Sequence, residues 1–253
     1  MTVYWLIFLV PALATLSPFR GTLQLRRASW LVVGFLLCYL IGLRHQIGGD
    51  WYAYLENFGV IAGKSFMEAT ALDNGEAGFN ALSWLVASAG LGIHTLNLVC
   101  AFIFVVGLVV FCRQQPLPWL ALAIAVPYLV TVVAIGYTRQ AAALGFLFMA
   151  ISSIRDSSQI RYAVLVLLAS LFHHSALLWL PLGMLVGTKR ISVKVAAGFI
   201  VLTLLFVLML MERYDDLWHQ YVEVGMVSEG GPIRVWMNAV AAIVLLVTRK
   251  HWR

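Results

Sequence analysis

Residues 95–112 read TLNLVCAFIFVVGLVVFC and contain no charged side chain. A helix that spans a bilayer needs about 20 largely apolar residues, so this stretch predicts a membrane span. The whole sequence agrees with that prediction, because 62% of its residues are hydrophobic and 11% are charged. In soluble domains, about 45–50% of the residues are apolar and about 25% are charged. So apolar a chain cannot cover itself with polar surface in water, and we interpret it as an integral membrane protein.

Similar apolar runs recur along the chain and predict an all-α, polytopic membrane bundle of about nine spans. The first run is interpreted as a retained span and not as a cleaved signal peptide, because its basic residues follow the apolar stretch. Residues 78–92 are short, which favours a re-entrant or interfacial helix, although a crossing stays open. No repeat divides the sequence, and we expect one domain over residues 1–253. The expected spans are 2–18, 28–43, 95–112, 118–136, 140–154, 162–172, 175–187, 193–211 and 233–248.

The distribution of charge predicts the orientation of this bundle. Cytoplasmic loops of membrane proteins are enriched in Lys and Arg. With an outward N-terminus and nine crossings, 12 of the 17 basic residues lie on the cytoplasmic side and 10 of the 11 acidic residues lie outside. Two outer segments, 44–77 and 212–232, are then long enough to hold structure. The basic residues are scattered in ones to threes, so no nucleic-acid partner is expected.

Four groups of polar residues interrupt the apolar runs, all on the predicted outer side. Ionisable groups at membrane depth usually face a cavity, a partner or a substrate. The first group lies in RHQIGGDWYAY at residues 44–54, where the double glycine permits a tight turn that brings Arg44 and Asp50 to one site. The aromatic residues of this segment form either a stacking platform for sugar rings or an interfacial aromatic belt. They are Trp51, Tyr52 and Tyr54.

The second and third groups each pair a charged residue with an amide. Glu76 and Asn80 are four residues apart and share one face of a helix, or else Glu76 is a carboxylate favoured at a helix start by the macrodipole. Arg139 and Gln140 stand between two apolar runs. The planar, permanently charged guanidinium suits pyrophosphate, and the alternative is an arginine that reaches head groups from the end of a span.

The fourth group is the pair His173 and His174, in a break between two short apolar runs. A neutral imidazole, with an ordinary pKa near 6.5, suits general base work at neutral pH. The alternatives are a hydrogen bond at the helix break and a placement at the membrane interface without chemistry. Zinc is a weaker interpretation, because adjacent histidines point to different faces and no cysteine lies on this side. No cofactor is expected.

Taken together, these residues resemble the EpsG family of bacterial exopolysaccharide proteins, which is related to Wzy-type polysaccharide polymerases. The resemblance implies a glycosyltransferase of the bacterial inner membrane that acts at its periplasmic face. It also implies a fold like the multi-span GT-C-like glycosyltransferases, an undecaprenyl-pyrophosphate-linked oligosaccharide as donor, and other polysaccharide assembly and export proteins as possible partners. The likeness is carried, in chain order, by Arg44, Gly48, Asp50, Tyr54, Glu76, Gly78, Phe79, Arg139, Gln140 and the run His173-His174-Ser175-Ala176.

On this hypothesis an acceptor hydroxyl attacks the anomeric carbon of the donor sugar and expels the lipid pyrophosphate. Arg139 and Arg44 bind that leaving group, and Glu76 orients a base or a sugar hydroxyl. The proton of the acceptor goes to one of the candidate bases, His173, His174 or Asp50. A metal is optional, and a divalent metal at Asp50 stays open. Further substrate contacts are expected from Gln140, Asn80, Trp51, Tyr52 and Tyr54.

Two other functions remain open. In one, the same arginines bind the pyrophosphate only to move it, and the protein is a carrier of lipid-linked oligosaccharide or the partner of a flippase. In the other, the chain is a non-catalytic subunit of a polysaccharide export complex. The ordered set of outer arginines, acids and histidines favours the enzyme, because a carrier more often places its charges near the middle of the membrane.

Overall fold

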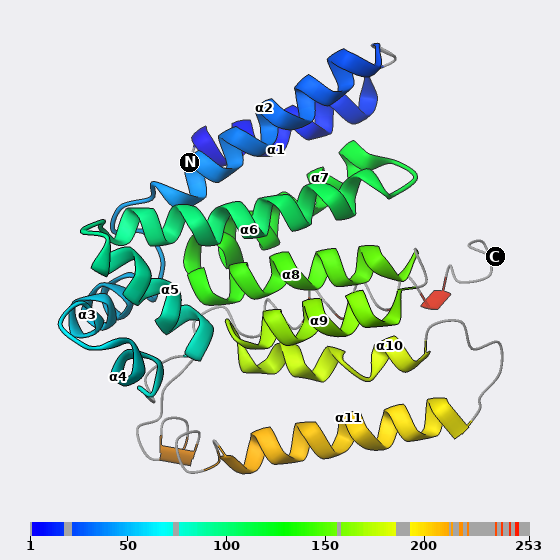
Figure 1. Ribbon diagram of the computed structural model, residues 1–253. Helices are drawn as coiled ribbons and strands as arrows, with labels where there is room; N and C mark the ends of the chain where they lie inside the picture. The colour runs from blue at the N-terminus through cyan, green and yellow to red at the C-terminus, as the bar shows by residue number, and fades with distance from the viewer. Residues whose placement is uncertain are drawn as a thin grey trace. The chain divides into compact units, whose positions relative to one another are not determined.

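The computed structural model describes residues 2–17, 22–72, 76–155, 158–185 and 193–212, with scattered single positions beyond. Every element in these ranges is helical (Figure 1). The chain divides into two compact units, Met1–Leu205 and Phe206–Arg253. All residues discussed below belong to the first unit. In the second, the described structure is the end of α11 (Val193–Glu212) and those single positions. Apart from these, the expected outer segment 212–232 and span 233–248 lie outside the described residues.

Six apolar segments of the first unit form helices that follow one another in alternating directions (Figure 1). In this array α6 packs against both α2 and α8, α8 packs on α9, and α1 packs on α7. The first six expected spans are therefore confirmed as helices. Their bounds are α1 Thr2–Leu16, α2 Leu23–Gly42, α6 Ile93–Arg113, α7 Pro118–Ala125 with its π-helical continuation η1 Val126–Ala134, α8 Thr138–Ile154 and α9 Gln159–Ser170.

Two of these helices, α2 and α6, are long and apolar enough to cross a membrane. The others are shorter apolar helices of 10–17 residues. The expected span 175–187 needs correction, because the described part of it is broken. A 3₁₀ helix, η2 (His174–Trp179), and a single turn, α10 (Leu182–Leu185), replace one continuous helix. Pro181 stands between them, and proline lacks the N–H that would continue the helical ladder.

Three short helices gather at one end of the array, between α2 and α6 in the chain (Figure 1). They are α3 (Trp51–Ala62), α4 (Phe66–Thr70) and α5 (Ala77–Ser88), and α5 packs on both of the others. With 12 residues, α5 is about 18 Å long, whereas the hydrocarbon core is about 30 Å thick. This length favours the re-entrant or interfacial helix predicted for residues 78–92, and the absence of a crossing stays a prediction that the structure does not test.

Glycine sets the distance between the two central helices. A Cβ atom added to Gly107 of α6 would collide with the carbonyl oxygen of Gly145 in α8, and one added to Gly145 would collide with the backbone of Ile103. Small residues of this kind let helix backbones approach closely where the bilayer supplies no hydrophobic driving force between helices. The α6–α8 contact helps to set the position in space of the start of α8, where part of the site described below lies.

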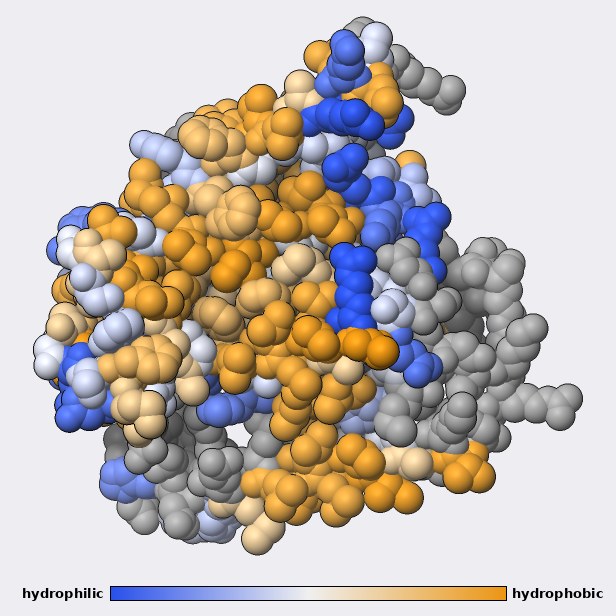
Figure 2. Space-filling view, in the orientation of Figure 1, coloured by the Kyte–Doolittle hydropathy of each residue, from blue (hydrophilic) through white to orange (hydrophobic). Residues whose placement is uncertain are grey.

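The two ends of the array differ in charge. Figure 2 shows an apolar face over the middle of these helices, with hydrophilic residues at their right-hand ends. The helix termini at that end carry Arg26, Arg27, Arg113, Arg155 and Arg161. The opposite termini belong to the end of α2, the start of α8 and the end of α9, which are the places where the predicted polar groups stand. These five arginines and the candidate site residues thus occupy opposite ends.

Gly107→Ala should lower the stability of the protein, because the added methyl group pushes α6 away from the Gly145 carbonyl. Overpacking of this kind costs about 1–3 kcal/mol. The apparent unfolding temperature in detergent measures the effect. Gly59→Ala is the matched control, since a Cβ atom at that helical glycine meets nothing within 4 Å. Equal stability of the two variants would contradict the packing described here.

Candidate functional site

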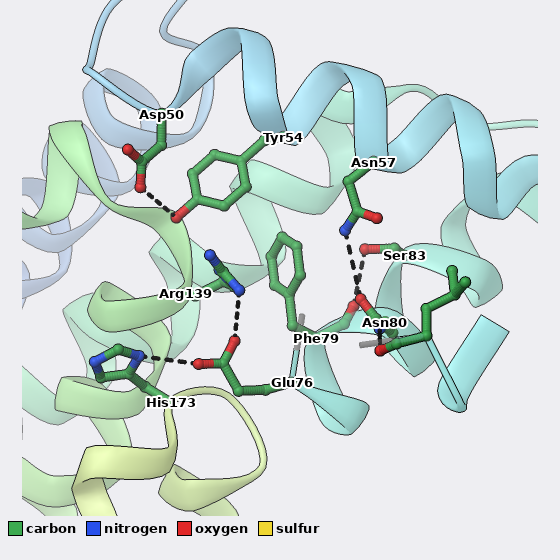
Figure 3. Close-up of polar contacts among 10 residues, drawn as sticks. Asp50, Tyr54, Asn57, Glu76, Phe79, Asn80, Ser83, Arg139 and His173 are labelled. Carbon is green, nitrogen blue, oxygen red and sulfur yellow. Dashed lines mark hydrogen bonds and ion pairs between the residues drawn. The ribbon is translucent and has the colours of Figure 1, made fainter. Parts of the chain in front are cut away.

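A buried carboxylate joins a cation and an imidazole at the end of the first unit where α2 ends and α8 begins (Figure 3). Glu76 Oε2 lies 2.8 Å from Arg139 Nη1, and Glu76 Oε1 lies 3.0 Å from His173 Nδ1. The Glu76 side chain is only 3% exposed, whereas those of Arg139 and His173 are 28% and 33% exposed. We call these three residues the Glu76 cluster. The carboxylate of the cluster is buried, whereas its guanidinium and imidazole side chains are partly exposed.

Close packing between α5 and the end of α9 brings Glu76 to His173. The N–H of Gly78 donates to the carbonyl of Leu171 at 2.9 Å. A Cβ atom at Gly78 would lie 2.7 Å from Leu171 Cβ, so only glycine permits this approach. Glu76 is the residue that precedes α5, but its side chain makes no capping hydrogen bond to that helix. The carboxylate points to Arg139 and His173, which places it in an ion-pair network as well as at a helix start.

Helix breaks deliver the other two members of the cluster. The chain leaves η1 at Ala134 and begins α8 at Thr138, which puts Arg139 in the first turn of the new helix. Similarly, α9 ends at Ser170, and His173 adopts an extended conformation before η2. At a helix end a side chain has fewer helical neighbours on one side. Side chains from different helix ends can therefore point toward a common site.

Aromatic rings surround the cation of the cluster (Figure 3). The Arg139 guanidinium carbon lies 5.5 Å from the centroid of the Tyr54 ring and 6.0 Å from that of Phe79. Such cation–π contacts contribute about 0.5–2 kcal/mol, the upper value applying where water is excluded. The Tyr54 hydroxyl donates to Asp50 Oδ2 at 3.4 Å. Tyr54 and Asp50 therefore extend the network from α3 to the Glu76 cluster.

Arg44 lies in the protein interior and not in the open part of this network. It is 4% exposed, and its guanidinium donates to the Ala134 carbonyl at 3.0 Å and to the Thr138 hydroxyl. That hydroxyl in turn donates to Asn97 Oδ1 at 3.2 Å. Arg44 thus bridges the end of η1 and the start of α8, where it satisfies a carbonyl at a helix C-terminus. Little of its surface is left for a pyrophosphate.

The double glycine forms a tight turn, and that turn packs on the same helix break. Gly48 has a φ of +106°, a backbone conformation that other residues rarely adopt. A Cβ atom there would lie 2.9 Å from the carbonyl oxygens of both Ile135 and Gly136. The turn leads directly into the half-buried Asp50 and then α3. Its close approach to the break brings the start of α3 next to the start of α8.

The three aromatic residues predicted as a stacking platform do not share one surface. Trp51 is buried, with its ring centroid 5.5 Å from that of His45 and 5.7 Å from that of His94. Tyr52 is exposed, and Tyr54 is buried beside Arg139. Helical geometry explains the separation, because neighbouring residues of α3 point in different directions.

The remaining predicted residues divide between the core and the surface. Asn80 is fully buried; its side-chain amide donates to the Leu72 carbonyl at 3.3 Å and accepts from Asn57 at 3.4 Å. Its hydrogen bonds thus fix α5 and are not directed at open space. Gln140 is half-buried, and His174 is exposed without a described contact to the Glu76 cluster. Of the two histidines, only His173 contacts the carboxylate.

The contacts of the cluster determine its charge. Burial raises the pKa of the Glu76 carboxyl, but the hydrogen bond with His173 and the charge of Arg139 outweigh it and lower the pKa to about 2. The carboxylate is therefore ionised and can only accept hydrogen bonds. His173 Nδ1 then carries the proton in their contact, and Nε2 of a neutral ring keeps its lone pair. A carboxylate that fixes an imidazole in this way prepares the other nitrogen for base work.

The residues of the site offer no ready metal centre in the described ranges, because no three His, Cys, Asp or Glu side chains there are grouped to hold an ion. The polar contact described for Asp50 is with Tyr54.

Sequence reasoning missed the interior part of this network. The sequence did contain an indication of Asn97 and Thr138, because a polar residue within or beside an apolar span usually has a partner. Phe79 was named only as one of the residues that carry the family resemblance. Nothing local indicated its contact with Arg139, because a phenylalanine next to an apolar run is expected in any core.

Comparison with known proteins gives one match. A model of the EpsG family matches residues 27–253 of the chain. Searches of curated proteins and of solved structures found no match. The matched range contains every member of the Glu76 cluster and the segments that position them.

Glu76 should make the stability of the protein depend on pH between 4.5 and 2. Its pKa falls from an ordinary 4.5 to about 2 in the folded protein, so its stabilising contribution is complete above pH 4.5 and is lost as the pH falls toward 2. A shift of that size corresponds to on the order of 3 kcal/mol. Unfolding of the wild type and of Glu76→Gln in detergent, measured from pH 6 down to 2.5, checks this.

The difference in stability between wild type and Glu76→Gln should shrink as the pH falls through this range. Glu56→Gln, which removes an exposed acid from α3, is the matched control and should keep a constant difference from wild type. A pH-independent difference for Glu76→Gln would contradict the ionised cluster.

Proposed function

The chain belongs to the EpsG family, and on that premise we propose that it is a membrane glycosyltransferase of the polysaccharide polymerase type. Family membership supports a membrane protein of exopolysaccharide biosynthesis. The proposed reaction transfers sugar units from an undecaprenyl-pyrophosphate-linked donor to an acceptor glycan at the periplasmic face of the inner membrane. The observation that carries the proposal is the buried Glu76, which holds a cation and an imidazole side by side.

The transfer requires a base for the acceptor. The acceptor oxygen attacks the anomeric carbon and forms the new glycosidic bond, while its proton passes to His173 Nε2. Glu76 accepts a hydrogen bond from Nδ1 and stabilises the positive charge that the ring gains. The His173 side chain is 33% exposed, which supports access of an acceptor to the ring. General base catalysis contributes about 100- to 10,000-fold. Asp50 is the alternative base, and it would act from the α3 side.

The leaving group requires a cation. As the bond between the anomeric carbon and the phosphate oxygen breaks, the electron pair departs with the lipid pyrophosphate. Arg139 uses Nη1 for Glu76, and we assign its remaining N–H groups to the pyrophosphate oxygens. Because Tyr54 and Phe79 hold the guanidinium from the other sides, the cation is preorganised and needs no reorientation during the reaction.

Arg44 enters this proposal as a positioning residue. Its hydrogen bonds hold the break between η1 and α8, and α8 carries Arg139 in the next position after Thr138. Exposed Tyr52 and half-buried Gln140 are the predicted substrate contacts that retain surface for a sugar. Asn80 and Trp51 act through the packing of α5 and α3.

The charge asymmetry supports the periplasmic assignment. The Glu76 cluster lies at the end of the helices opposite to Arg26, Arg27 and Arg113. Loops rich in arginine stay in the cytoplasm during insertion. The cluster then opens toward the other face, where an outward-facing lipid-linked donor presents its pyrophosphate.

Replacing His173 with Gln should abolish most of the activity, and replacing His174 should not. His173→Gln keeps a hydrogen-bond donor for Glu76 but cannot take the proton, so we expect turnover to fall about 100- to 10,000-fold. His174→Gln is the matched control, because the adjacent exposed histidine has no described contact with the cluster. Lengthening of a lipid-linked oligosaccharide by purified protein in detergent measures both. Wild-type turnover in His173→Gln would exclude it as the base.

Arg139→Ala should remove turnover, since the pyrophosphate loses its cation; loss of one electrostatic donor typically costs about 100- to 1,000-fold. Arg139→Lys keeps the charge without the planar fork and should retain part of the activity with a raised KM. Gel filtration checks that each variant stays folded, because Arg139→Ala leaves Glu76 with one partner fewer.

The same assay separates the transferase from the other functions. A transferase lengthens glycan in detergent without a gradient, a carrier moves lipid-linked oligosaccharide only between two compartments, and a scaffold does neither. Wild-type activity in a folded Arg139→Ala variant would refute the role assigned to this arginine.

A further inference from the structure

A small basic pocket lies at the opposite end of the helices from the Glu76 cluster. It is formed where α2 begins, α6 ends and α7 begins, and its volume is about 130 Å³. Trp30, one of its walls, is buried and stacks on Trp119 of α7 with ring centroids 4.3 Å apart and ring planes at 11°. The stacked rings give the pocket a rigid wall. Its lining residues are Leu23, Arg26, Arg27, Trp30, Arg113 and Pro118.

Three positive charges share this pocket without a counter-ion from the part of the chain that the structure describes. Arg26, Arg27 and Arg113 are exposed, and no ion pair or side-chain hydrogen bond to another described residue engages their guanidinium groups. Two of them, Arg26 and Arg27, follow directly on the first turn of α2, the end at which the helix dipole is positive. Cations placed there are repelled by the helix and by one another. An anion in the pocket would relieve both costs.

We propose that this pocket binds a phosphate group, either the phosphodiester of an anionic phospholipid or free phosphate. Arginine forks match phosphate oxygens in pairs, and basic pockets between membrane helices on the cytoplasmic side are suited to lipid head groups. The volume accommodates one phosphate group. Leu23 and Pro118 supply apolar surface beside the charges, as the glycerol backbone of a lipid requires. The site is separate from the proposed transferase chemistry and does not depend on it.

The alternative explanation is a diffuse attraction of cytoplasmic arginines for an anionic membrane surface. Arg155 allows the two to be separated. It is an exposed arginine that follows α8 at the same end of the array, but it does not line the pocket. A diffuse attraction weakens equally when any of these arginines is removed, whereas a pocket is sensitive only to its own.

The experiment uses the full chain in nanodiscs of phosphatidylcholine with and without phosphatidylglycerol. Native mass spectrometry after release into neutral detergent counts the phosphatidylglycerol molecules that stay bound. A second arm titrates inorganic phosphate into protein held in phosphatidylcholine alone and follows thermal unfolding. The variants are Arg26→Gln with Arg113→Gln, and Arg155→Gln as the matched control. Gel filtration selects folded protein in each case.

We expect wild type and Arg155→Gln to retain phosphatidylglycerol equally, and the double variant to bind it about 25-fold more weakly, at about fivefold for each arginine. Stabilisation by inorganic phosphate that the double variant loses would identify free phosphate as a ligand of the same pocket; its absence, with lipid retention intact, would identify the lipid. Equal retention by wild type and the double variant would overturn the proposal. An equal loss in Arg155→Gln would overturn it too, in favour of diffuse attraction.

Discussion

The cost of burying one carboxylate governs the architecture of this protein. An ionised acid with only 3% of its side chain exposed is tolerated only when partners compensate its charge. For Glu76 those partners come from the start of α8 and the end of α9, which are 63 and 97 residues away in the chain. Three helix ends must therefore meet at one point. The glycine contact between α5 and α9, and that between α6 and α8, make the meeting possible.

The residues of the proposed chemistry lie at helix breaks, and the continuous helices form the frame around them. The long apolar helices α2 and α6 bear no member of the cluster, whereas Glu76, Arg139 and His173 all lie within a few residues of a helix end. Backbone groups freed at such breaks need new partners in an apolar surrounding. Arg44 is such a partner, because it donates to the Ala134 carbonyl, and its own charge is buried as a result. Arg44 thus supports a helix break, and Arg139 is left for the proposed chemistry, although both stood out for the same reason in the sequence.

The two ends of the helix array differ in how their charges are paired. One end holds a nearly neutral, tightly paired cluster, in which Glu76 offsets the charge of Arg139. The other holds Arg26, Arg27 and Arg113, which no described residue neutralises. The chain belongs to the EpsG family. In the functions that we propose, the first end carries out the sugar transfer and the second end binds a phosphate group.

Local features of the sequence were sufficient for the helical class, the first six helices and the polar groups at one end, because hydropathy and helix-breaking residues act over a few neighbours. They failed at 175–187, where a 3₁₀ turn and Pro181 replace a span. Only the tertiary structure decided that His173 and not His174 meets the acid, that Arg44 and Asn80 are buried, and that the three aromatic residues of α3 separate. The direction of a side chain and its depth depend on helices far apart in the chain, and no local pattern encodes that contact.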